Sequence, residues 1–261
     1  MRYLLTFLAL VVLNTTPFAA LADVLRPIET QVGSVIDGDT FITREGQHIR
    51  LLGINTPEKK RDANPAEEGA YAATEYAKKI LPKGKDVTLK FDENDHDRYG
   101  RLLAHVYLDD GTWVNKQMVE EGYAHVYTFP DNRSHIDELL NAETQARRAG
   151  KGLWQQRRWQ ILEALPVPDK YQAGKFQLVK GTPIKAAKVK GVIYLNYGDD
   201  WRTDFTIEIP PAAQKLFKAE GVEPLIAFID KPIIVRGHLK PVNGMLIRVT
   251  HPEQIQPASA E

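Results

Sequence analysis

Residues 36–58 read IDGDTFITREGQHIRLLGINTPE, a stretch in which short apolar strands alternate with tight turns. Gly38 and Gly46 separate three strands that the alternating pattern predicts over residues 31–37, 40–44 and 47–52. Folding this meander back on itself gathers the polar side chains at its two ends, those of Asp37, Asp39, Asn55, Thr56 and Glu58. The stretch therefore predicts the first half of a sheet and a place where oxygen ligands for a hard cation collect. The alternative is an ordinary hairpin in which Asp and Gly only form the turn.

The elements expected after this stretch complete a small barrel. A helix is predicted over residues 65–81, where apolar residues recur every three or four positions and Pro82 ends the pattern. Two strands follow, over residues 86–91 and 102–108. Three strands, a helix and two strands are the succession of a five-stranded Greek-key barrel of the OB type. Two more helices, over residues 114–121 and 134–149, are expected to pack on it.

A second domain is predicted after residues 165–174, LPVPDKYQAG, which contain two prolines and a glycine without apolar periodicity. Strands are expected over residues 176–189, 192–197, 205–209, 233–239 and 245–249, with a helix over 212–219. The order of elements repeats that of the first domain, so we expect a second, OB-like barrel. The predicted fold class is mainly β with helices (α+β), with a barrel domain over 29–158, a linker over 166–174 and the second domain over 175–257.

The first 22 residues are typical of a secretory signal peptide. Arg2 precedes an apolar run over residues 3–13, and Ala20, Leu21 and Ala22 supply the small-residue pattern of a cleavage site. The alternative is an uncleaved anchor, but the run is shorter than the roughly 20 residues that cross a bilayer. We expect export to the periplasm or the extracellular space, with no transmembrane segment after cleavage.

Composition limits the chemistry that this chain can perform. It has no cysteine among 261 residues, so thiolate metal sites and disulfides are excluded and any metal must bind to oxygen or imidazole. The 34 basic residues equal the 34 acidic ones, whereas a protein that holds nucleic acid by bulk charge is strongly basic. Recognition of phosphate must therefore be local and made by individual arginines.

Two arginines and one glutamate are the candidates for catalysis. Arg50 lies in an apolar strand, where its charge needs either a carboxylate partner or a ligand, and both explanations are open. Arg101 begins the strand predicted over 102–108, and two such planar groups suit a phosphodiester that gains charge in its transition state. Glu58 is the candidate general base, and its alternative role is that of a plain surface residue.

Three motifs in this order resemble those of the staphylococcal nuclease-like (thermonuclease) family. They are IDGDT at residues 36–40, RLLGINTPE at 50–58 and DRYGR at 97–101. The likeness extends over residues 33–154 and ends in AETQARRAGKGLW, which is similar to the helix and tail that close the family's domain. It implies an OB barrel with appended helices that hydrolyses DNA and RNA with Ca²⁺ and leaves 3′-phosphates.

The resemblance also implies residue roles. Arg50 and Arg101 would hold and neutralise the phosphate, and Glu58 would activate water. Asp39 would bind calcium, together with the main-chain carbonyl of Thr56. Asn55 departs from the aspartate of the best-known member, and the lost negative charge should weaken calcium binding.

Further residues are candidates for contacts with the nucleic acid. Arg98 and Tyr99 are similar to the family's contacts to a second phosphate and to sugar or base, and Tyr127 with Phe129 would extend a stacking surface, unless they are core residues. His96 and His105 match no zinc spacing. The sequence thus predicts a monomeric, calcium-dependent nuclease acting on DNA or RNA. The alternatives are an inactive nuclease-like binding or scaffold protein and a metal-independent ligand-binding OB protein.

Overall fold

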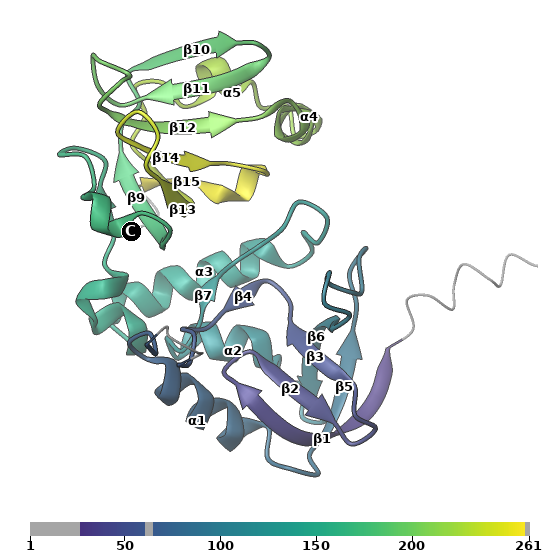
Figure 1. Ribbon diagram of the computed structural model, residues 1–261. Coiled ribbons are helices and arrows are strands. Elements are labelled where there is room, and N and C mark those ends of the chain that lie inside the picture. The colour runs from purple at the N-terminus through teal and green to yellow at the C-terminus, as the bar shows by residue number, and fades with distance from the viewer. Residues whose placement is uncertain (1–26, 61–64, 259–261) are drawn as a thin grey trace, which may run out of the picture.

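The computed structural model describes residues 27–60 and 65–258, and the predicted signal peptide lies outside them. The described chain forms two β-rich domains, one above the other in Figure 1, with the long helices on the first. The predicted class, mainly β with helices, is confirmed.

The first domain is a closed five-stranded barrel, as the succession of elements predicted. Each strand pairs antiparallel with its neighbours, except that β3 and β6 run parallel. The side chains that point inward, such as those of Val32, Phe41 and Ile49, are at most 1% exposed. In order around the barrel the strands are β1 (Ile28–Asp37), β2 (Thr40–Thr43), β3 (His48–Leu51), β6 (Leu102–Leu108) and β5 (Asp86–Lys90).

Three helices cover the barrel, namely α1 (Ala70–Ile80), α2 (Val114–Glu120) and α3 (Ile136–Arg148). α1 packs on β1, and α2 packs on both β6 and α3. The first helix was predicted from residue 65, but it begins only after Gly69, whose φ of 96° is left-handed and interrupts helical geometry. A short ladder of β4 (Ile54–Asn55) with β7 (His125–Val126) was not predicted, because two residues carry no periodic signal.

Five strands of the second domain follow one another in the same order as those of the first, but the sheet continues to β9 and β8 and is open. The closed second barrel that the sequence predicted is therefore not found within the described residues. β10, β11, β12, β14, β13 and β9 follow one another, and β12 pairs parallel with β14 as β3 does with β6. The single strand predicted over 176–189 is divided into β9 and β10 around Pro183, which has no N–H to donate to a ladder. The elements are β8 (Leu162–Glu163), β9 (Phe176–Gly181), β10 (Lys185–Val189), β11 (Val192–Asn196), β12 (Phe205–Ile209), α4 (Pro211–Ala219), α5 (Pro224–Ala227), β13 (Ile233–Lys240), β14 (Met245–Arg248) and β15 (Ile255–Pro257).

The two domains are joined by a buried ion pair. Arg236 on β13 and Glu143 on α3 are 2% and 0% exposed, and the Nη2 of the arginine lies 2.7 Å from Oε2 of the glutamate. Burial alone would raise the pKa of Glu143, but Arg236 and Arg147 lower it below its ordinary value. Arg236 Nη1 also donates to the carbonyl of Val126 at 3.3 Å. The second domain is therefore fixed directly against β7.

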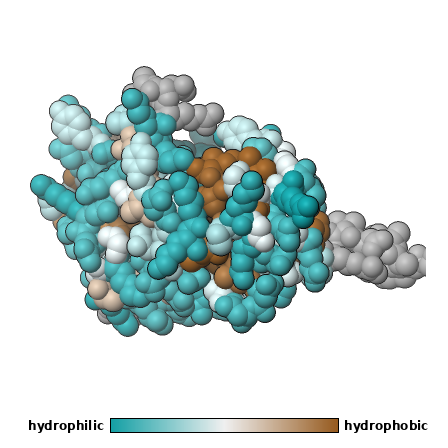
Figure 2. Space-filling model, turned by 90° about the horizontal axis from the view of Figure 1, so that it is seen from below, coloured by the Kyte–Doolittle hydropathy of each residue, from teal (hydrophilic) through white to brown (hydrophobic). Residues whose placement is uncertain are grey.

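The surface of the first domain is mostly hydrophilic on the face seen from below, around a hydrophobic patch (Figure 2). Some exposed apolar area is normal for a folded protein. Within the part of the chain that the structure describes, no helix is both long and apolar enough to cross a membrane.

The buried ion pair predicts a large effect on stability. Glu143→Ala should lower the free energy of unfolding by about 3–5 kcal/mol, because it leaves the buried charge of Arg236 without its main partner. Glu75→Ala is the matched control, because it breaks an exposed pair with Lys78 and should cost no more than about 0.5 kcal/mol. Urea denaturation measures both values. Equal losses in the two variants would contradict the role of the buried pair.

Candidate functional site

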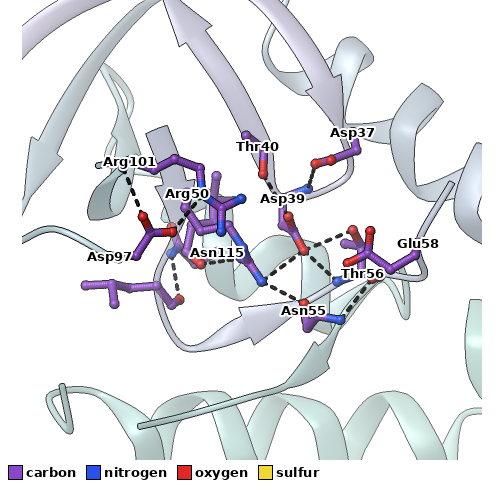
Figure 3. Close-up of polar contacts among 12 residues, drawn as sticks. Asp37, Asp39, Thr40, Arg50, Asn55, Thr56, Glu58, Asp97, Arg101 and Asn115 are labelled. Atoms are coloured by element: carbon purple, nitrogen blue, oxygen red, sulfur yellow. Dashed lines mark hydrogen bonds and ion pairs between the residues drawn. The ribbon is translucent and has the colours of Figure 1, made fainter. Parts of the chain in front are cut away.

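The carboxylate of Asp39 joins the two ends of the meander. Its Oδ2 accepts hydrogen bonds from the main-chain N–H of Thr56 at 2.7 Å and from the Thr56 hydroxyl at 3.1 Å. Its Oδ1 accepts from the hydroxyl of Thr40 at 3.0 Å (Figure 3). Asp39 is 5% exposed, so these bonds compensate the burial of its charge. The motif at residues 36–40 and the motif at 50–58 thus meet at one carboxylate.

Gly38 makes this approach possible. A Cβ atom at this position would lie 2.7 Å from Cγ2 of Thr56 and 2.9 Å from Cβ of Ala73, distances that packed atoms do not adopt. The glycine in the first motif is therefore required by close packing.

Arg50 reaches from β3 towards the same carboxylate. Its Nη2 lies 3.2 Å from Oδ2 of Asp39 and 2.8 Å from Oδ1 of Asn55. Its Nη1 donates to the carbonyl of Leu51 at 2.7 Å. The salt bridge considered from the sequence is therefore present, and the same side chain also lines a groove.

Asn55 occupies the place between Arg50 and Thr56. Its Oδ1 accepts from Arg50, and its Nδ2 donates to the main-chain carbonyl of Thr56 at 3.1 Å. Two oxygens predicted as calcium ligands are thus engaged with internal donors in this structure. An aspartate here could not donate to that carbonyl.

Negative charge is concentrated beside these residues. The pKa of Glu58 is raised by burial and by the charges of Asp39 and Asp37, and the pKa of Asp37 is raised by burial and by Asp39. Arg50 acts in the opposite direction on both groups but does not cancel the effect. The three carboxylates therefore concentrate negative charge at this end of the groove.

Arg101 is oriented by a residue that the sequence analysis did not include among the site residues. Its Nε lies 2.7 Å from Oδ2 of Asp97, and Oδ1 of Asp97 accepts from the main-chain N–H of Tyr99 and of Arg101. Burial opposes ionisation of Asp97, but these donors hold its pKa below the usual value. The DRYGR motif carries the signal, since an aspartate commonly bonds the N–H two residues on in a turn.

Asn115 is a second residue that was missed. It is fully buried on α2, and its side chain accepts from the N–H of Val106 and donates to the carbonyls of Leu52 and Ala104. It thereby joins β6, which follows Arg101, to the end of the strand that carries Arg50 (Figure 3). A lone asparagine in a helical pattern gives no sign of this contact.

Most of the predicted site residues line one groove of about 1260 Å³. Eight of the nine belong to its wall, and the ninth, Thr56, lies beneath it in contact with Asp39. The eight are Asp39, Arg50, Asn55, Glu58, Arg98, Tyr99, Arg101 and Tyr127.

The candidates for nucleic-acid contact differ in exposure. Tyr99 is 68% exposed, and its hydroxyl accepts from Arg98 at 2.6 Å. Tyr127 is half-buried, and burial raises its pKa. His96 lines the groove and pairs with Asp95, whereas His105 is buried against Trp113 with its pKa lowered to about 4.

The donors in this groove suit a hard cation more than a soft one. Carboxylates and the amide oxygen of Asn55 line the groove and the main-chain carbonyl of Thr56 lies beneath it, and oxygens of these kinds are the ligands that Ca²⁺ takes. Among residues 27–60 and 65–258, no three His, Asp or Glu side chains are arranged to hold a metal by themselves. A cation would therefore also need the oxygens of Asn55 and Thr56, waters or a ligand.

Comparisons with known proteins concern the first domain. The family model described as staphylococcal nuclease homologue matches residues 48–156. The thermonucleases of Staphylococcus hyicus and Staphylococcus intermedius are 33% and 32% identical over 123 and 142 residues, which is 72% and 83% of their lengths and 46% and 53% of this chain. An uncharacterised protein of Bacillus anthracis is 36% identical over 138 residues, and the chain spans 64% of it, with 50% of this chain covered.

Because the pKa of Glu58 is raised, replacement of this residue by glutamine should stabilise the protein, and the gain should depend on pH. The folded state disfavours the charge of this carboxyl, so wherever the pH is high enough to ionise it, ionisation opposes folding and Glu58→Gln should raise Tm in EDTA. Below pH 4.5, the ordinary value, the carboxyl is protonated in both states and the gain should vanish. Glu75→Gln at an exposed position of α1 is the control. A gain that grows towards acid pH would refute the assignment of the charge cluster.

Proposed function

This chain belongs to the staphylococcal nuclease homologue family, and from that premise we propose that it is a calcium-dependent nuclease that hydrolyses phosphodiester bonds of DNA or RNA. The observation that carries the proposal is the convergence of Arg50, Glu58 and Arg101 on one groove beside Asp39. The three residues come from separate parts of the first barrel, and their combination of two cations and a base suits the attack of water on a phosphodiester.

Each side chain has a role in this reaction. Glu58 accepts a proton from the attacking water, and its raised pKa brings its basicity closer to neutral pH. Arg50 and Arg101 donate to the phosphate oxygens and neutralise the charge that the pentacoordinate state develops. Asp97 is a positioning residue, because its bond to Nε fixes the direction of the Arg101 guanidinium.

Calcium, when bound, would be held by Asp39, the side-chain oxygen of Asn55 and the carbonyl of Thr56, and would supply positive charge to polarise the phosphate. The oxygen-only donors and the raised pKa of Asp37 and Glu58 support this choice. In the structure the side-chain oxygen of Asn55 accepts a hydrogen bond from Arg50 and the carbonyl of Thr56 accepts one from Asn55, so both donors compete with the cation for the oxygens. We therefore expect this site to bind Ca²⁺ more weakly than it would with an aspartate at position 55.

An inactive binding or scaffold protein is the competing function, and one assay separates the two. Purified protein is incubated with plasmid and with single-stranded DNA in Ca²⁺ or in EDTA. The proposal requires degradation in Ca²⁺ alone and products that end in 3′-phosphates. Binding without cleavage in either condition would establish the competing function.

The proposed location of the protein in the cell rests on residues 1–22 alone. Their charged start, apolar run and small-residue cleavage pattern support export to the periplasm or the extracellular space, where the protein would act as a monomer. The mass of the protein recovered from culture medium and periplasmic extract tests cleavage after Ala22.

Substitution of the catalytic residues should reduce the rate without unfolding the protein. Glu58→Gln and Arg101→Ala should each lower kcat by at least about a hundredfold, because each removes an interaction of the transition state. Glu75→Gln and Arg44→Ala, both exposed and away from the groove, are the matched controls and should retain the wild-type rate. A normal melting curve with near wild-type turnover in either catalytic variant would remove that residue from the mechanism.

The departure at position 55 predicts an altered metal requirement. Asn55→Asp adds a carboxylate to Asp37, Asp39 and Glu58 and removes the donor to Thr56, so it should lower Tm in EDTA and lower the Ca²⁺ concentration for half-maximal rate. Added Ca²⁺ should restore Tm more in the variant than in the wild type. Identical calcium titrations for the two proteins would place Asn55 outside the metal's ligands.

A further inference from the structure

A second cavity of about 270 Å³ lies between the two domains and adjoins the catalytic groove. Tyr127 and Phe129 line both spaces. The first domain also contributes Val126, Thr128 and Pro130, and the opposite wall comes from the second domain, chiefly from Phe176 on β9 and from His238 and Lys240 on β13. Its volume is close to the roughly 300 Å³ at which pockets for small ligands begin. The groove therefore continues past the first domain.

Aromatic rings from both domains meet in this cavity. The ring of Tyr127 lies 5.2 Å from that of Phe129, 5.5 Å from that of Phe176 and 5.8 Å from that of His238, in each case edge to face. Phe129 is 48% exposed and His238 is partly exposed, so parts of these rings remain free. Free aromatic faces beside a phosphate site are what unpaired bases stack on.

The charge of the cavity wall is positive. Arg236, Lys240 and Arg248 line it, and no carboxylate does so among the residues that the structure describes. Arg236 is paired with Glu143, and Nε of Arg248 lies 2.5 Å from Glu208. Lys240 is exposed, and within the described ranges it makes no ion pair. It is therefore the cation most available to an anionic ligand.

His238 presents a neutral ring at neutral pH. Burial and the neighbouring charge of Lys240 lower its pKa, while Glu67 acts weakly in the opposite direction. A neutral imidazole beside a lysine suits a nucleotide, because the base can stack on the flat ring and the phosphate can pair with the cation.

We propose that this cavity is a subsite for one unpaired nucleotide of a single-stranded substrate, next to the groove in which the bond is cut. The base rests against His238, Phe129 and Tyr127, and Lys240 pairs with its phosphate. The proposal rests on the proposed nuclease function for the identity of the groove. The bond from Arg236 to the carbonyl of Val126 fixes β13 beside the segment that carries Tyr127 and Phe129. The bond of Thr128 to His251 at 2.6 Å fixes the residues after β14 to the same segment, so the subsite is preformed.

The second domain has another surface with basic and aromatic residues, formed by Trp201, Arg202 and Lys188, but it fits this role less well. Trp201 is covered in part by its neighbour Arg202, which lies 4.6 Å above the ring and pairs with Asp200. Neither Trp201 nor Lys188 on β10 lines the catalytic groove or the cavity next to it.

The test measures binding rather than cleavage. The full-length protein in EDTA is titrated into fluorescein-labelled dT12, and anisotropy gives Kd at several salt concentrations. His238→Ala should raise Kd about five- to tenfold, because a base stack is lost, and His238→Phe should restore most of the affinity. Lys240→Ala should raise Kd and reduce the slope of log Kd against log salt by about 0.7, the value for one phosphate contact on a single strand.

Two lysines of the same domain serve as controls. Lys215 on α4 is exposed and does not line either space, so Lys215→Ala should match the wild type in Kd and slope. If Lys188→Ala weakens binding and Lys240→Ala does not, the strand crosses β10 and β11 and the proposal is overturned. Wild-type values for both His238→Ala and Lys240→Ala would also overturn it.

A separate measurement keeps the two proposals distinguishable. Cleavage of a dinucleotide by the wild-type protein in Ca²⁺ reports on the catalytic groove alone. Cleavage of the dinucleotide with unaltered dT12 binding in the variants would sustain the nuclease and refute the subsite. Weaker dT12 binding in the variants of a protein that cuts no substrate would sustain the subsite and refute the nuclease.

Discussion

The buried carboxylate of Asp39 is the constraint on which the site depends. It holds the start of β2 to the main chain at Thr56 and pairs with Arg50 on β3, so three segments are fixed by one side chain. Because the group is nearly inaccessible, removal of any partner would leave part of a charge uncompensated in the interior. The position of Arg50 relative to Glu58 is therefore set by the internal hydrogen bonding of the barrel and does not rely on a bound ligand.

Much of the first domain could be predicted from the sequence because its signals are local. The alternating pattern and the glycine turns located the barrel strands to within a few residues. Pro82 marked the end of the first helix, although that helix begins five residues later than predicted. The candidate site could be predicted for the same reason. Its residues lie at strand ends in three short motifs, and strand ends that face the same side of a barrel bring their side chains together. The resemblance assigned roles to Arg50, Glu58 and Arg101, and the groove that they share agrees with those roles without testing them.

What could not be predicted are contacts between residues far apart in the chain. Arg236 and Glu143 are separated by 93 positions, and each alone resembles an ordinary charged residue of a strand or a helix. Asn115 gives no sign that it joins two strands, and the two-residue pair of β4 with β7 is too short for any periodic pattern. The interruption of the predicted strand at Pro183 carried a signal, since proline is excluded from the interior of a ladder. The domain contact nevertheless matters for function, because it places β13 beside the groove.

A purely structural role leaves the charge arrangement of the groove unexplained. Burial and mutual repulsion raise the pKa of Asp37 and Glu58, so ionisation of these groups at neutral pH opposes folding. A scaffold gains nothing from this arrangement, since neutral side chains of the same size would be more stable there. A catalyst does gain, because a base of raised pKa and a surplus of negative charge are what proton abstraction and cation binding need. The destabilisation is compensated within the same domain, by the full hydrogen bonding of Asp39 and by the pairing of Asp97 with Arg101.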